Sequence, residues 1–230
     1  MPPPSDDAGT YLAAALSRRR FLARSASAAA AGLAGAAGLL VPLTARAANG
    51  EVHDFRPGVR INGDVANARS VIRAGDRIVT DSNGYFVVAI GRDAFMLRSR
   101  TEMVLERETP DSVLITGLRL FTGAMGAVFG KGPPRRIASV TVTAGIRGTG
   151  VYLETRGPDV YFCTCYGEVE LAPLREPGAI EMVRSTRHAP RIVRAEPRDG
   201  RWIEPSAMDT HTDAEMDMLE KCVGRRAPWI

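Results

Sequence analysis

Residues 77–90 read RIVTDSNGYFVVAI, and this stretch decides the fold class. Two runs of β-prone residues, 77–80 and 85–90, flank the pair Asn83-Gly84. An Asn-Gly pair supplies the positive φ angles of tight turns between antiparallel strands. The stretch therefore predicts two short strands joined by a turn.

The same pattern extends along the chain from Val59 to Leu171. Val59 and Ile61 precede Asn62-Gly63, and no helical period competes with the strand pattern. Further β-prone runs occupy residues 95–97, 103–105, 113–120, 137–143, 146–154 and 160–171. Short strands at this spacing predict a mainly β protein, built as a β-sandwich or as stacked hairpins.

The C-terminal part differs. Thr212 and Glu215 fit a capping box, in which the Thr hydroxyl and the Glu carboxylate satisfy backbone amides at a helix start. Met216, Leu219 and Val223 follow at helical spacing, and Gly224 is a stop signal. We expect a short C-terminal helix of about three turns with its apolar stripe facing the β-domain.

Prolines 177, 190 and 197 lie between Pro173 and Pro205 and argue against central strands. We therefore expect residues 172–230 to form a proline-containing arm followed by the helix.

Residues 1–47 predict an export signal of the twin-arginine type. Arg18-Arg19 precede Phe21-Leu22, an Ala/Gly/Leu-rich run follows over residues 26–43, and residues 45–47 read Ala-Arg-Ala. A cationic segment, a modest apolar segment and an A-x-A site are typical of a cleaved signal peptide. The predicted location is periplasmic or secreted, and an uncleaved signal anchor in the inner membrane is the alternative.

The basic charge belongs to that signal. The whole chain has 30 Lys and Arg against 26 Asp and Glu; five of those Arg and two of those Asp precede residue 48, which leaves 25 against 24. A nearly neutral mature chain does not favour a nucleic-acid partner.

Several segments resemble the FecR domain family. They are Asn62-Gly63, residues 74–80 (AGDRIVT), Leu118-Arg119-Leu120 with Thr122-Gly123-Ala124, and residues 145–150 (GIRGTG) with the turn Arg147, Gly148, Thr149. The resemblance covers about residues 57–171 and implies an exported FecR-like β-domain. In the name-giving proteins this domain is the periplasmic part of a transmembrane transducer that controls a sigma factor.

Here sixteen residues precede the twin-arginine motif, fewer than a folded cytoplasmic module needs. We therefore expect a non-catalytic binding, sensing or scaffold module of the cell envelope. Its partner would be an envelope protein or a glycan, with the twin-arginine translocase engaged during export.

The sequence contains no recognisable catalytic signature. The glycines of residues 145–150 have the wrong spacing for a dinucleotide loop, lack the Gly-Lys-Ser/Thr of a P-loop and precede a strand. Nucleophile motifs such as G-x-S-x-G are absent from the sequence as well.

Cys163 and Cys165 lie in the stretch YFCTCYG, residues 161–167. Residues two apart in a strand share a face, here with Tyr161, while Tyr166 is expected on the other face. Because such residues lie about 6.6 Å apart, a disulfide between the two cysteines is disfavoured. One alternative is a disulfide from Cys222 to Cys163 or Cys165; another is that all three are buried apolar thiols.

A third alternative is a metal site. His188 and His211 would complete an S2N2 tetrahedron with the two cysteines. Zinc suits this ligand set best, ahead of copper or haem iron. His53, near the predicted mature N-terminus, is expected to be disordered.

Overall fold

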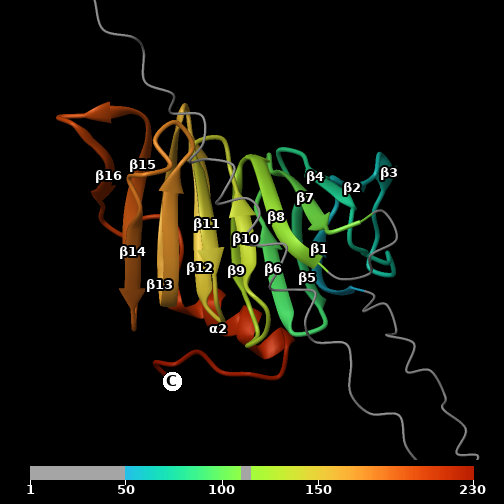
Figure 1. Ribbon diagram of the computed structural model, residues 1–230. Helices are drawn as coiled ribbons and strands as arrows, with labels where there is room; N and C mark the ends of the chain where they lie inside the picture. The colour runs from blue at the N-terminus through green and yellow to red at the C-terminus, as the bar shows by residue number, and fades with distance from the viewer. Residues whose placement is uncertain (1–49, 110–114) are drawn as a thin grey trace, which may run out of the picture. The chain divides into compact units, whose positions relative to one another are not determined.

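Two β-sheets and one helix make up the computed structural model of the protein, which describes residues 50–109 and 115–230 (Figure 1). The first sheet, here called the helix-side sheet, has the strand order β1 (Glu51–Arg56), β5 (Tyr85–Ile90), β6 (Asp93–Leu97), β9 (Ala124–Val128), β12 (Gly150–Arg156), β13 (Asp159–Pro173), β15 (Ala189–Arg198), β16 (Arg201–Pro205). The second, the open sheet, has the order β3 (Asp64–Val65), β2 (Val59–Ile61), β4 (Arg77–Thr80), β7 (Glu102–Arg107), β8 (Ile115–Thr122), β10 (Arg135–Ala138), β11 (Val142–Ile146), β13, β14 (Glu181–Ser185).

The two sheets pack face to face. Their inward side chains form one continuous apolar cluster, with Phe86 and Phe162 from the helix-side sheet and Leu105 and Leu118 from the open sheet fully buried in it. Alternate residues of each strand supply this cluster, as expected for sheets that bury one face. The predicted mainly β fold with a short C-terminal helix is confirmed.

Strand β13 belongs to both sheets. Its first part pairs with β12 and β15 in the helix-side sheet, and its second part pairs with β11 and β14 in the open sheet. The register against β12 shifts at Cys165, because Val151 pairs with Thr164 whereas Gly150 pairs with Tyr166. This extra residue is a β-bulge, which bends a strand and increases its twist.

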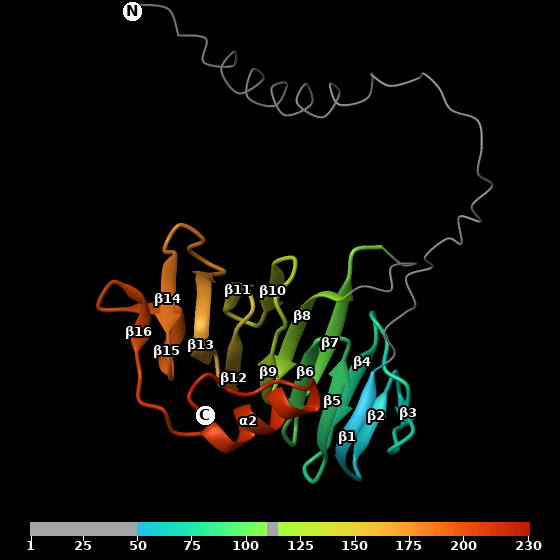
Figure 2. The ribbon, with the colours of Figure 1, turned by 90° about the horizontal axis from the view of Figure 1, so that it is seen from below.

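Helix α2 (Asp213–Cys222) lies across the outer face of the helix-side sheet (Figure 2). The capping box predicted from Thr212 and Glu215 is present, and Gly224 follows the helix with a φ of +70°. Met216 and Leu219 are fully buried against the sheet, next to Gly126 of β9. The predicted helix and its inward stripe are therefore confirmed.

The arm predicted between Pro173 and Pro205 is wrong, because β14, β15 and β16 occupy much of it. Pro190 is only the second residue of β15, and Pro197 lies where the pairing of β15 with β16 loses its register. Prolines are tolerated at strand starts and bulges. The residues after 172 therefore do not form an arm apart from the sheets, since β14 and β15 both pair with β13.

Smaller differences concern turns and the N-terminal side. Residues 137–143 and 146–154, each predicted as one run, are divided by turns between β10, β11 and β12. Asn62 and Gly63 have the expected positive φ angles, whereas Asn83 and Gly84 do not. There the Asp81 carboxylate accepts bonds from both backbone amides. His53 lies in β1, a strand the sequence pattern did not reveal.

The predicted signal peptide, with Arg18 and Arg19, lies outside the described residues. Among the residues that are described, no helix is long and apolar enough to cross a membrane.

The bulge in β13 requires glycine at position 150. A Cβ atom there would lie 2.3 Å from the Tyr166 ring, whereas a Cβ at Gly145 would have no neighbour closer than 3.7 Å. We expect Gly150→Ala to lower the free energy of unfolding by about 1–3 kcal/mol, the range for overpacking. Gly145→Ala, the matched control in the neighbouring strand β11, should change it little. Urea denaturation measures both, and equal effects of the two substitutions would contradict this account of the bulge.

Candidate metal centre

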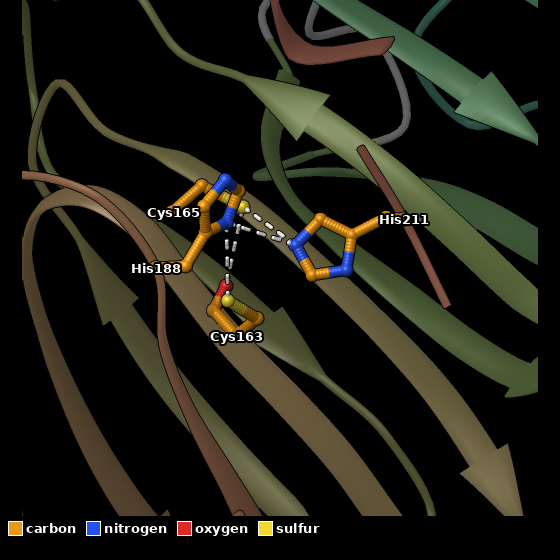
Figure 3. Close-up of side chains that lie close together, drawn as sticks. All are labelled: Cys163, Cys165, His188 and His211. Carbon is orange, nitrogen blue, oxygen red and sulfur yellow. Dashed lines mark hydrogen bonds between the residues drawn. The ribbon is translucent and has the colours of Figure 1, made fainter. Parts of the chain in front are cut away.

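Four side chains converge under the start of helix α2. They are Cys163, Cys165, His188 and His211, and their ligand atoms all lie within 4.8 Å of one another (Figure 3). Cys163 and Cys165 come from β13, His188 from the turn between β14 and β15, and His211 from the segment before α2. The four residues that the sequence suggested as ligands are thus brought together from three separate parts of the chain.

The two cysteines face the helix, on the outer side of the helix-side sheet. Both have no exposed area and belong to the apolar cluster around Met216 and Leu219. The bulge at Cys165 turns the following residue as well, so that Tyr166 packs against this same cluster. The prediction that Tyr166 lies on the opposite face is therefore wrong, because strict alternation ends at a bulge.

His188 has an unusual backbone conformation. Its φ is +51°, in the left-handed region that few residues other than glycine adopt. Its backbone amide donates to the Cys165 carbonyl with a distance of 2.8 Å, which fixes the turn against β13. Such conformations persist where the surroundings enforce them, and they concentrate at functional sites.

His211 is held by aromatic stacking. Its ring lies parallel to that of Tyr152, with centroids 4.5 Å apart, and the residue is 4% exposed. Its Nε2 atom faces the cluster, whereas its Nδ1 atom is buried without a hydrogen-bond partner. The stacking leaves Nε2 as the atom available to a ligand in the cluster.

The distances between the ligand atoms fit a tetrahedrally coordinated zinc ion. Zinc bonds of about 2.3 Å to sulfur and 2.0–2.1 Å to nitrogen put S and N about 3.5 Å apart, and two nitrogens about 3.3 Å apart. Here Cys163 Sγ lies 3.7 Å from His188 Nδ1, and Cys165 Sγ lies 3.4 Å from His211 Nε2. The two nitrogens are 3.1 Å apart. Three of the six edges of the cluster therefore match those of an S2N2 coordination shell, and the other three are no longer than 4.8 Å.

Asp213 orients His188. Its Oδ1 lies 2.6 Å from His188 Nε2. A carboxylate only accepts hydrogen bonds, so in the neutral imidazole Nε2 carries the proton and Nδ1 keeps its lone pair for the cluster. This carboxylate–histidine arrangement is usual around metal ions. The hydrogen bond with His188 is the main cause of a lowered pKa at Asp213.

The Trp229 ring packs beside His188 and Tyr166, next to the cluster. Its ring lies 5.3 Å from that of His188 and 5.6 Å from that of Tyr166. The roles of Asp213 and Trp229 were not predicted. Asp213 had a sequence signal as the first residue of the capped helix, but only the fold reveals its contact with His188.

The two thiols differ in acidity. Hydrogen bonding with Cys165, together with contacts to the two imidazoles, lowers the pKa of Cys163 to about 5. Burial raises the pKa of Cys165 well above its usual value. A thiolate beside imidazoles is a nucleophile in some enzymes, but Cys163 has no exposed area for a substrate to reach.

The disulfide considered for Cys222 is not formed, since all three cysteines are free. Cys222 lines a cavity of about 510 Å³ with His53 and Asp54 of β1 and Val87 of β5. Strand β5 is four strands away from β13 in the helix-side sheet, which corresponds to roughly 19 Å. His53 is likewise remote from the cluster.

The turn Arg147, Gly148, Thr149 has a backbone role. Gly148 has a φ of +58°, and Thr149 is buried against Gly167 of β13. Arg147 is exposed to solvent. The turn thus joins β11 to β12, as expected for glycines at a corner between strands.

Comparisons with known proteins give no family. No protein-family model matches the chain, and no curated protein matches it. Two crystal structures of a "putative anti-sigma factor" from Parabacteroides distasonis ATCC 8503 are similar at 14% and 11% identity, with TM-scores of 0.46 and 0.43. They cover 58% and 66% of this chain, and the chain spans about three-fifths of each of them (60% and 61%). The FecR resemblance stays a prediction.

The position of Cys222 yields a test. Because Cys222 is half-buried, we expect Cys222→Ala to lower the free energy of unfolding by about 1 kcal/mol or less, the typical effect of a point substitution. Thiol titration of the denatured, metal-stripped protein should find three thiols, and dithiothreitol should leave its unfolding midpoint unchanged. A loss of about 2–4 kcal/mol in the variant, matched by the reductant, would instead indicate the disulfide.

Proposed function

We propose that the protein is a non-catalytic, zinc-binding β-sandwich module of the cell envelope. The observation that supports this best is the convergence of Cys163, Cys165, His188 and His211 with the spacing of a tetrahedral shell. Two thiolates and two imidazoles are ligands that zinc favours, ahead of copper and iron.

The burial of the ligands favours a structural ion over a catalytic one. Cys163 and Cys165 have no exposed area, and the His188 side chain is only 7% exposed. Catalytic zinc sites keep a coordination position open for water or substrate, whereas structural sites use four protein ligands. Four buried protein ligands leave no position for chemistry.

The ion would tie distant segments together. It would connect β13 to the turn before β15 and to the segment that leads into α2. Because Asp213 bonds His188 and is also the first residue of α2, the ion would fix the helix start against the sheet. Binding free energy of this kind contributes directly to folding.

Export in the folded state suits such a site. The twin-arginine route carries folded proteins, so zinc would be loaded in the cytoplasm before both cysteines meet an oxidising compartment. The FecR resemblance and the near-neutral mature chain agree with an envelope module that binds a protein partner.

Metal analysis tests the proposal. The purified protein should contain about one zinc per chain by inductively coupled plasma mass spectrometry, because all four ligands of a closed site are present. Cys163→Ser and His211→Ala should each lose the ion and lower the unfolding temperature, and a chelator should have the same effect on the parent protein. His53→Ala and Cys222→Ser are matched controls that should keep the ion. Absence of zinc from the parent, or its retention in both ligand variants, would refute the site.

Asp213 yields an independent test. We expect Asp213→Asn to weaken zinc binding about 10- to 100-fold, the usual effect of losing a carboxylate partner of a metal-bound histidine. Competition with a chromophoric chelator measures this affinity. Arg187→Ala is the control, because it removes the exposed ion pair with Asp213 but leaves the Asp213–His188 bond. If both substitutions weaken binding equally, the carboxylate does not act through His188.

A further inference from the structure

The outer face of the open sheet carries an apolar hollow. On the helix-side sheet the corresponding face is covered by α2, whereas no helix of the described residues lies over the open sheet. The hollow has a volume of about 370 Å³, within the range of binding pockets. Its apolar walls are Phe121, Val140 and Leu174, which are 38%, 47% and 46% exposed.

The register explains why the hollow forms at this place. Arg119 of β8 pairs with Ala138 of β10, Ala138 pairs with Thr143 of β11, and Thr143 pairs with Ala172 of β13. Paired residues of neighbouring strands point to the same face. The small side chains of Ala138, Thr143 and Ala172 therefore lie in one row across the sheet, with Arg119 at its end. Larger residues beyond this row, at the same end of the strands, form the walls.

The exposed apolar residues gather at this end of the sheet. Of nine large apolar side chains exposed in the described residues, three line the hollow. Ile180, 55% exposed, directly precedes β14, and Met182, 43% exposed, lies in it. Both continue the outer face of the open sheet beyond β13. Grouped exposed apolar side chains mark binding surfaces more often than scattered ones do.

The rim has excess positive charge. Arg119 and Arg136 both approach the single carboxylate of Glu106, at 2.9 and 3.6 Å. Their side chains are 49% and 60% exposed, so each guanidinium keeps donors for a second carboxylate. Arginine can bind a carboxylate through two parallel hydrogen bonds.

Ser139 adds an unsatisfied polar group. It lines the hollow and is 8% exposed, and its hydroxyl is buried without a hydrogen-bond partner among the described residues. A ligand could satisfy this oxygen only after rotation of the Ser139 side chain toward the hollow, because the atom has almost no exposed area.

We propose that this hollow is a docking site for a segment of another protein that presents a large apolar side chain next to a carboxylate. The apolar side chain would fill the space between Phe121, Val140 and Leu174, and the carboxylate would bind Arg119 or Arg136. A membrane surface fits less well, because recognition of anionic lipids draws on about four to eight basic residues. Here two arginines share one glutamate.

Peptide titration with NMR detection tests the proposal on the purified protein. The probe is Ac-Glu-Phe-Leu-Glu-NH2; the comparison peptides are Ac-Lys-Phe-Leu-Lys-NH2 and Ac-Glu-Gly-Ser-Glu-NH2. We expect saturable shifts of the Ser139, Val140 and Leu174 amides with the first peptide, and binding weaker by about tenfold, or 1.4 kcal/mol, with the other two.

Two substitutions sharpen the test. Val140→Asp should abolish the shifts, whereas Val65→Asp, which alters a more exposed valine on β3, should leave them unchanged. Arg136→Glu should reduce the preference for the acidic peptide over the basic one. Absence of saturable shifts, equal binding of the three peptides, shifts away from the hollow, or Val140-dependent binding to phosphatidylglycerol vesicles in place of the peptide would each overturn the proposal.

Discussion

The structure depends on strand β13, because it is the strand that both sheets share. Its 15 residues exceed the usual strand length, and they pair with β12 and β15 before the bulge and with β11 and β14 after it. A straight strand cannot turn from one layer of a sandwich to the other, and the bulge at Cys165 with the positive φ of Gly167 supplies the turn. The cysteines thus lie where β13 leaves the helix-side sheet for the open sheet.

Strands were predictable from the sequence where they leave a local pattern, and not where they depend on tertiary structure. Runs such as 77–80 and 85–90 were predictable because a strand with one buried face leaves a local pattern. Strand β1 left none, since most of its residues are exposed, and β15 was hidden by Pro190 and Pro197. Those prolines are compatible with a strand only because of where its pairing begins and loses register, which depends on tertiary structure.

The candidate site likewise has a part that the sequence indicates and a part that only the fold reveals. Residue chemistry alone named Cys163, Cys165, His188 and His211, because few other soft ligands exist in the chain. Their convergence is tertiary, since it needs a bulge, a left-handed backbone at His188 and the stacking of His211 on Tyr152. The part played by Asp213 was equally hidden, because helix capping and orientation of His188 are separate uses of one residue.

The two outer faces of the sandwich then have different physical characters. On the helix-side sheet, Met216 and Leu219 exclude water, and buried thiols and imidazoles lie at the edge of that packing. Four convergent polar ligands in such a place are costly unless an ion or shared protons satisfy them. On the open sheet, small side chains leave a hollow with exposed arginines at its rim. If an ion fixes the helix on one face and a partner docks on the other, stability and recognition reside on opposite sides of one core.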